Sequence, residues 1–347
     1  MNRIKKWQVW VVLLVSLFAS PAVHSQGKAP VSLIFDTDIG PDYDDVGALA
    51  MVHYFADHGE AKILATISSN KYGKVSSVLN VFNTYYKRPN IPIGVPKGNA
   101  VKMGDSRGWS DSITRKYPHT IKSNDEVPDA VALYRKVLAA QPNNSVTIVT
   151  VGFLTNLAGL LKSPPDSYSK LNGTQLVRSK VKRLVSMAGS FPFGRGFNNQ
   201  KDAEASKLTF DQWPTEIIFS GGEIGKKIKT GLPLIENEAI QNSPVKDVYR
   251  INMAKNKNDK KGRMSWDQTA VLVAVRGADP YYTLVPGKMI SMSDGSNQWD
   301  HLKTGHFYLL EKMNSIDVGK EIEAMMHHQP VKAVAGVKSK IRKRALM

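Results

Sequence analysis

The stretch Val31–His53, VSLIFDTDIGPDYDDVGALAMVH, decides the fold. It opens with the apolar run Val31–Phe35, which has the length of a buried β-strand. Five aspartates follow within the ten residues Asp36–Asp45. Apolar residues then recur at i, i+3, i+4 and i+7 over Val46–His53, which places them on one face of a helix. The stretch therefore predicts a strand, an acidic loop and a helix in succession.

The same alternation of short apolar runs and helical segments continues along the chain. The expected strands are Val31–Phe35, Ile63–Ser68, Ile91–Val95, Val146–Val151, Val181–Met187 and Glu216–Phe219. Helical periodicity returns over Val131–Leu138 and over Gln268–Arg276, where Gly277 is expected to end the helix. Met325–His328 is expected to end another. We therefore expect an α/β fold with a single domain, in which helices flank a mostly parallel central sheet.

The two ends of the chain differ in composition from the rest. Residues 1–25 have the basic start, apolar centre and small-residue exit of a signal peptide, with cleavage expected after Ser25. The apolar run Val9–Ala19 is shorter than the ~20 residues that span a bilayer. The α/β domain is expected over residues 30–330, followed by a basic tail over 331–347. We expect an exported protein, periplasmic or secreted, without stable membrane insertion. It has no cysteine, so no disulfide stabilises it.

The formal net charge of +17 bears on the choice of partner. The C-terminal tail contributes basic residues without any acidic one. No aromatic-studded basic motif or helix-turn-helix pattern accompanies the charge, so nucleic-acid binding is not expected. The chain also lacks the Gly-x-Gly-x-x-Gly fingerprint of dinucleotide binding after a strand and the Gly-x-Ser-x-Gly elbow of serine hydrolases. A small molecule is the expected partner.

The five aspartates indicate a metal site. Carboxylates this close repel one another unless a cation gathers them or water screens them. The aspartates directly follow a buried strand. In open α/β sheets, ligands bind beyond the carboxyl ends of the strands, which is where these aspartates lie. The ligands are oxygen only, with no adjacent cysteine or histidine, which favours a hard ion such as Ca²⁺ or Mg²⁺.

The run Asp36–Leu49 resembles the N-terminal signature of the inosine-uridine nucleoside hydrolase family. Later segments are similar to further motifs of that family in the same order. They are Val149–Ala158, Met187–Ser190, Gly196–Asn198, Asp202–Ala205 and Ser265–Ala270. The resemblance implies a single α/β domain, a tightly held Ca²⁺ and hydrolysis of the N-glycosidic bond of ribonucleosides. The implied partner is a nucleoside or ribosyl substrate, and a homo-oligomer is possible.

The resemblance also assigns residues. The implied metal ligands are Asp38, Asp42, Asp44, Asp45, Asp267 and the backbone carbonyl of Val151, with Asp42 and Asp44 competing for one place. Asp38 would also be the general base, because it can touch both the metal and the attacking water. Asn70 and Asn198 would contact the substrate. Cleavage of a ribosyl C–N bond builds positive charge on the sugar, which nearby carboxylates stabilise.

Two positions depart from the family pattern. Gly196 stands where the family usually has a glutamate that grips the ribose. Trp266 stands where many members have a histidine linked to protonation of the leaving group. Trp266 could stack on a nucleobase or belong to the core, and His301 and His306 are the alternative acids.

Two other functions are open. Strand-Asp-x-Asp also begins the haloacid-dehalogenase-type Mg²⁺-dependent phosphatases, although their acidic residues are spread over later segments. The departures at Gly196 and Trp266 suit an exported sugar-binding or nucleoside-binding protein that has kept the metal pocket and lost turnover.

Overall fold

A ten-stranded sheet organises the computed structural model, which describes residues 29–330. Its strands lie in the order β3 (Ile93–Gly94), β2 (Ala61–Ser68), β1 (Val31–Thr37), β4 (Val146–Thr150), β5 (Val181–Met187), β7 (Glu216–Ser220), β12 (His306–Glu311), β10 (Tyr282–Ser291), β11 (Ser296–Asp300) and β6 (Phe193–Arg195). Every neighbouring pair from β3 to β12 is parallel. The last three strands are antiparallel additions. The predicted single α/β domain with a mostly parallel sheet is confirmed.

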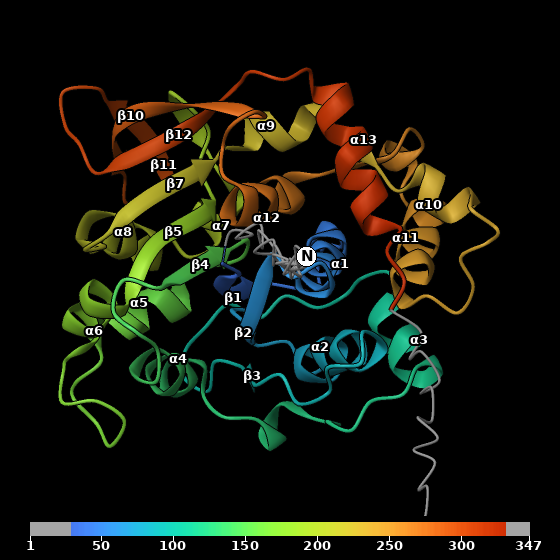
Figure 1. Ribbon diagram of the computed structural model, residues 1–347, viewed down its shortest axis with the longest axis horizontal. Coiled ribbons are helices and arrows are strands. Elements are labelled where there is room, and N and C mark those ends of the chain that lie inside the picture. The colour runs from blue at the N-terminus through green and yellow to red at the C-terminus, as the bar shows by residue number, and fades with distance from the viewer. Residues whose placement is uncertain (1–28, 331–347) are drawn as a thin grey trace, which may run out of the picture.

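Helices cover both faces of the sheet (Figure 1). One face carries α1 (Asp44–Asp57), α2 (Val75–Tyr85), α3 (Trp109–Lys116), α9 (Gly222–Lys227), α10 (Leu232–Glu236), α11 (Pro244–Lys255), α12 (Trp266–Arg276) and α13 (Ser315–Met326). The other carries α4 (Ala130–Ala139), α5 (Thr155–Lys162), α6 (Gly173–Lys180) and α8 (Ala203–Gln212), with the short α7 (Phe197–Lys201) before it. A small ribbon pairs β8 (Lys229–Thr230) with β9 (Arg263–Met264), and two 3₁₀ turns lie at Asn124–Glu126 and Lys257–Asp259.

The central strands are buried on both sides, so their side chains divide between two cores. In β1, Phe35 packs into the core beneath α1 and α12, whereas Ile34 packs into the core beneath α4 and α5. Val185 and Leu184 divide in the same way in β5. This alternation follows from the two-residue period of a strand. The carboxylates of the cavity therefore come from residues that follow the strands rather than from their centres.

Most predicted elements are confirmed within a residue or two. The exception is Ile91–Val95, where only Ile93–Gly94 pairs as a strand at the edge of the sheet. Pro92 lacks an N–H for a ladder, and Val95 instead forms an isolated bridge with Asp129. The helix over Gln268–Arg276 begins two residues earlier, at Trp266, and ends at Gly277, whose φ of 92° suits glycine. The antiparallel strands β10, β11 and β6, the parallel strand β12 and the β8–β9 ribbon were not predicted.

The predicted signal peptide and the basic tail lie outside the described residues. Among residues 29–330, no helix combines the length and the apolar character needed to cross a membrane.

Candidate active site

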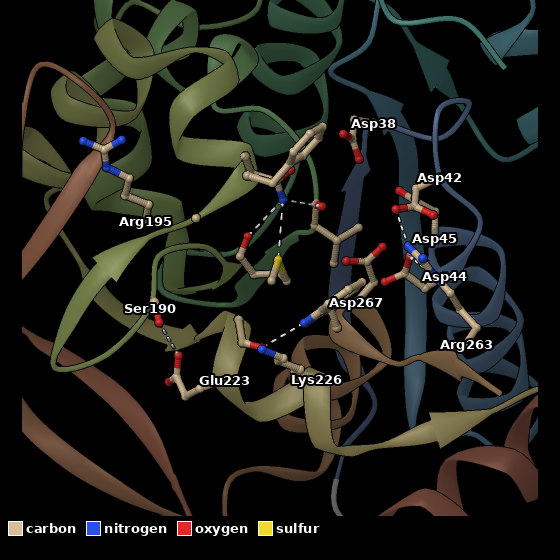
Figure 2. A pocket seen from close by; sticks show the side chains of 17 residues that line it. Asp38, Asp42, Asp44, Asp45, Ser190, Arg195, Glu223, Lys226, Arg263 and Asp267 are labelled. Carbon is tan, nitrogen blue, oxygen red and sulfur yellow. Dashed lines mark hydrogen bonds and ion pairs between the residues drawn. The ribbon is translucent and has the colours of Figure 1, made fainter. Parts of the chain in front are cut away.

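Loops that follow the parallel strands enclose a cavity of about 490 Å³ at the carboxyl edge of the sheet. Its wall includes residues that follow four strands in adjacent positions: Asp38 after β1, Val151 after β4, Ser190 after β5 and Glu223 after β7. Figure 2 shows the aspartates on one side of the cavity and Ser190 with Glu223 on the other. The volume suits a small molecule.

The ends of β1 and β4 approach so closely that position 152 has to be glycine. A Cβ at Gly152 would lie 2.3 Å from the backbone nitrogen of Asp38 and 2.5 Å from Oγ of Ser69. The backbone N–H of Val151 donates to the carbonyl of Asp36 at 2.8 Å. This contact brings the Val151 carbonyl and the Asp38 carboxylate to the same wall.

Three carboxylates form a group that could hold a metal ion. Asp44, Asp45 and Asp267 each offer one oxygen, and these oxygens lie within 4.8 Å of one another. Asp44 and Asp45 occupy the first turn of α1, where the helix dipole favours negative charge, and Asp267 occupies the first turn of α12. Packing of α1 against α12 therefore joins residues that are remote in sequence.

The group is buried, and its charges repel one another. Burial raises the pKa of Asp45 to about 7, and the charge of Asp44 adds to the rise. Burial raises the pKa of Asp44 to about 6, although the Arg263 guanidinium offsets part of the effect. The pKa of Asp267 is raised well above its usual range by burial and by Asp44, Asp45 and Asp38. A bound cation would relieve this repulsion.

Asp38 and Asp36 have different surroundings, although both lie at the end of β1. Asp38 is buried and lines the cavity, and burial, followed by the charge of Asp45, raises its pKa. Asp36 lies within β1, two residues after Ile34 and therefore on the same face of the strand. It accepts hydrogen bonds from Tyr134 at 2.8 Å and Asn156 at 3.1 Å, and does not line the cavity.

The buried Arg263 forms ion pairs with two aspartates of the acidic loop. Arg263 donates to Oδ1 of Asp44 at 2.8 Å and pairs with Asp42, whose side chain is 42% exposed. The guanidinium carbon of Arg263 lies 4.9 Å from the ring centre of Tyr43 and 5.0 Å from that of Trp266. Both distances suit cation–π contact. Asp42 is therefore neutralised by Arg263 and stays outside the three-carboxylate group, whereas Asp44 contacts both.

Asn198 holds the carbonyl predicted to bind metal. Its Nδ2 donates to the Val151 carbonyl at 2.8 Å and to the Met187 carbonyl at 3.1 Å, and both Asn198 and Val151 line the cavity. A carbonyl oxygen has two lone pairs, so this contact leaves Val151 able to accept a second partner.

Trp266 lines the cavity and is half-buried. Its indole Nε1 donates to the Gly222 carbonyl at 2.8 Å, which fixes the ring at the start of α12. One hydrogen bond and the Arg263 contact hold a flat aromatic surface at the cavity wall, where a base could stack.

The structure does not bring Asn70 to the cavity. The side chain is fully buried and does not line the wall. Its Nδ2 donates to the carbonyls of Asp38 at 3.1 Å and Met103 at 2.8 Å, while its Oδ1 accepts from Tyr72 and Met103 at 3.0 Å each. These backbone groups engage both ends of the amide, and the expected contact of Asn70 with the substrate stays a prediction.

Neither alternative histidine lies at the cavity. His301 is exposed beyond β11. His306 is buried, its Nδ1 accepts from the Met289 backbone at 3.1 Å, and burial lowers its pKa to about 4. Neither histidine is therefore among the residues that line the cavity.

Charged residues of the cavity wall were missed by sequence reasoning, among them Arg195, Glu223, Lys226 and Arg263. Arg263 follows two lysines and a glycine in Lys260–Arg263, a pattern typical of an exposed basic turn. Its spacing of four residues from Asp267 was the one available signal. Glu223 follows two glycines after β7, and nothing in its sequence neighbourhood distinguishes it.

The sheet and the buried carboxylates at its carboxyl edge agree with comparisons to known proteins. The Pyrimidine-specific ribonucleoside hydrolase RihA of Salmonella enteritidis PT4 is 27% identical over 232 residues, which cover 62% of this chain and 68% of that protein. An inosine-uridine preferring nucleoside hydrolase from Bacillus anthracis has a similar fold, with a TM-score of 0.63 at 12% identity over 86% of this chain and 99% of that one. A plant nucleoside hydrolase, the PpNRh1 enzyme, gives 0.62 at 17% identity over 86% and 98%.

The protein is therefore a hydrolase that acts on N-glycosyl compounds. The family model described as inosine-uridine preferring nucleoside hydrolase matches residues 33–332, and the chain belongs to that family. The resemblance stated from the sequence is confirmed. The family is metal-dependent, and the three-carboxylate group is where this chain could bind the metal.

Proposed function

We propose that the protein hydrolyses the N-glycosidic bond of ribonucleosides with a bound Ca²⁺ and with Asp38 as the general base. The observation that carries the proposal is the meeting of Asp44 and Asp45 with the remote Asp267 at a cavity of nucleoside size. Asp38 lines the same cavity.

The donor set fits a hard divalent ion. The ligands would be carboxylates of Asp38, Asp45 and Asp267 with the Val151 carbonyl, all on one wall. Asp44 is the better candidate than Asp42 for a further carboxylate, because Asp44 is buried in the three-carboxylate group, whereas the Asp42 side chain is 42% exposed and outside that group. Ca²⁺ takes six to eight oxygen ligands in flexible geometry, which this mixed set of carboxylates and a carbonyl suits.

The protein's own residues would position the reactants and move one proton. When bound, the metal supplies a fixed point for the ribose diol and for the attacking water, and it lowers the pKa of that water. Asp38 accepts the proton from the water, since its carboxylate lies at the tip of β1 within the cavity. The surrounding carboxylates stabilise the positive charge that develops on the sugar. Trp266 offers a stacking surface to the departing base.

The names of the relatives support a substrate class for this chain. RihA is named for pyrimidine ribonucleosides, and the Bacillus anthracis structure for inosine and uridine. We propose the same class of ribonucleosides for this chain, acting as an exported protein in the periplasm or outside the cell.

The test is a panel of purine and pyrimidine ribonucleosides, assayed for release of reducing sugar with added Ca²⁺ and with a chelator. We expect ribose release that the chelator abolishes and Ca²⁺ restores. Binding of nucleosides in a calorimeter without ribose release would instead favour a binding protein. Cleavage of p-nitrophenyl phosphate with Mg²⁺ and no action on nucleosides would favour a phosphatase.

A further inference from the structure

Glu223 places a second carboxylate in the cavity, away from the metal group. It lies in α9, directly after β7, and lines the wall on the side opposite Asp42 and Asp45 (Figure 2). Among residues 29–330 its carboxylate has no ion pair within 4.0 Å, and the charge of Lys227 acts on it only from farther away. A half-buried carboxylate is costly unless it receives hydrogen bonds.

The loop after β5 holds this carboxylate in place. Ser190 Oγ and the backbone N–H of Phe191 both donate to Oε2 of Glu223, each at 3.1 Å. Burial raises the pKa of Glu223, and its own backbone N–H, the two loop donors and the charge of Lys227 oppose the rise. Because both donors use one oxygen, the other oxygen, Oε1, is not engaged by the loop and can accept a hydrogen bond from a ligand.

The same loop cannot supply a side chain of its own at position 196. A Cβ at Gly196 would lie 2.4 Å from the backbone nitrogen of Gly189 and 2.9 Å from its Cα, and both are backbone atoms that cannot give way. Residues 189 and 196 of the loop are therefore in contact, which leaves no room for a side chain at position 196. The carboxylate at this end of the cavity comes from Glu223 of α9.

The loop also connects the two ends of the cavity. Asn198 at its far end donates to the Val151 carbonyl beside the metal group, and Ser190 at its near end donates to Glu223. A ribose held through its 2′ and 3′ hydroxyls at the metal group would lie along this loop. Its remaining hydroxyl, on the exocyclic 5′ carbon, can donate a hydrogen bond to an acceptor at the opposite end of the cavity.

We propose that Glu223 is a substrate-binding residue that accepts a hydrogen bond from the 5′-hydroxyl of the ribose. The inference rests on the proposed ribonucleoside hydrolysis and specifies which sugars that reaction takes. A carboxylate at this place selects nucleosides that carry a free 5′-hydroxyl, because only a donor can complete a hydrogen bond to it.

The experiment compares uridine with 5′-deoxyuridine in the wild-type protein and in Glu223→Ala, Glu223→Gln and Glu236→Ala. Glu236 is the matched control, since it is exposed at the end of α10 and does not line the cavity. Loss of one hydrogen bond to a charged group predicts a kcat/KM for 5′-deoxyuridine about tenfold to a hundredfold below that for uridine in the wild type. Glu236→Ala should keep that ratio.

In Glu223→Ala we expect the uridine value to fall to the 5′-deoxyuridine value, so that the ratio approaches one. Glu223→Gln keeps an oxygen for Ser190 and Phe191 and should fold; its ratio should lie between the two. An unchanged ratio in both variants would overturn the proposal. Equal losses on both substrates, with loss of the alkaline limb of the pH profile, would also overturn it, because Glu223 would then be the acid for the leaving group.

The two proposals fail separately. If the wild-type protein releases no ribose from any nucleoside, ribonucleoside hydrolysis is wrong. The affinities of uridine and 5′-deoxyuridine, measured by calorimetry on the same four proteins, then test Glu223 alone. Equal affinities in the wild type would reject it, and a preference for uridine that Glu223→Ala removes would support it.

Discussion

Replacing Arg263 with methionine should destabilise the protein strongly in the absence of metal. The arginine side chain is 7% exposed and the Asp44 side chain 3% exposed, so the substitution leaves a buried carboxylate without its cation. Removal of one partner from a buried ion pair costs about 3–5 kcal/mol. With an unfolding entropy of ~2.1 cal/mol/K per residue over roughly 300 folded residues, the melting temperature should fall by about 5–8 °C.

The assay is thermal unfolding in a chelator and again with Ca²⁺. The metal should recover part of the loss, because it supplies positive charge beside Asp44. Arg250→Met is the matched control: its side chain is 61% exposed and pairs with Asp247 at 3.2 Å, so we expect less than about 1 kcal/mol. An Arg263→Met protein that melts like the control would refute the view that Arg263 neutralises the acidic loop.

Three further changes test the site and the core. Asp38→Asn should keep the fold and lower kcat by about 10²- to 10⁴-fold, and a near-normal rate would place the base elsewhere. Asp267→Asn should remove the stabilisation by Ca²⁺, about 2.7 kcal/mol at a hundredfold excess over Kd, which a full Ca²⁺-induced shift would contradict. Burial lowers the pKa of His53 from 6.5 to about 3, so its neutral form stabilises the fold fully above pH 6.5 and this contribution is lost as the pH falls toward 3. His53→Gln should therefore flatten the loss of unfolding free energy between pH 6.5 and 5 by about 2 kcal/mol, measured by urea titration; an identical slope would argue against a buried neutral imidazole.

Local sequence was enough to place the strands and the first acidic loop. Val31–Phe35 and Val181–Met187 are short segments rich in Val, Leu and Ile, and their buried centres are typical of strands covered on both faces. The edge strand near Ile93 was overestimated, because the same apolar composition also suits a short segment that pairs on one side only. The antiparallel strands β10 and β11 carry mixed polar and apolar residues, so their periodicity gave no clear signal.

Candidate residues differed in how far sequence could assign them. Asp45 and Asp267 were predicted together from the resemblance, and the structure brings them to one group. Asn70 was assigned to the substrate by its position in a motif, and the structure shows its amide bonded to the backbone of Met103 and Asp38. A motif gives residue type and order, whereas hydrogen-bonding partners depend on the tertiary structure.

By itself the sequence determined that strands alternate with helices and that acidic residues follow the first strand, because both depend on spacing along the chain. Tertiary structure alone decided that Asp42 pairs with Arg263 and that Glu223 faces the cavity. Those outcomes depend on how α1, β9 and α9 meet beyond the ends of the strands. A charge is stabilised by whatever lies within a few ångströms, and residues remote in sequence reach that distance only when the sheet has formed.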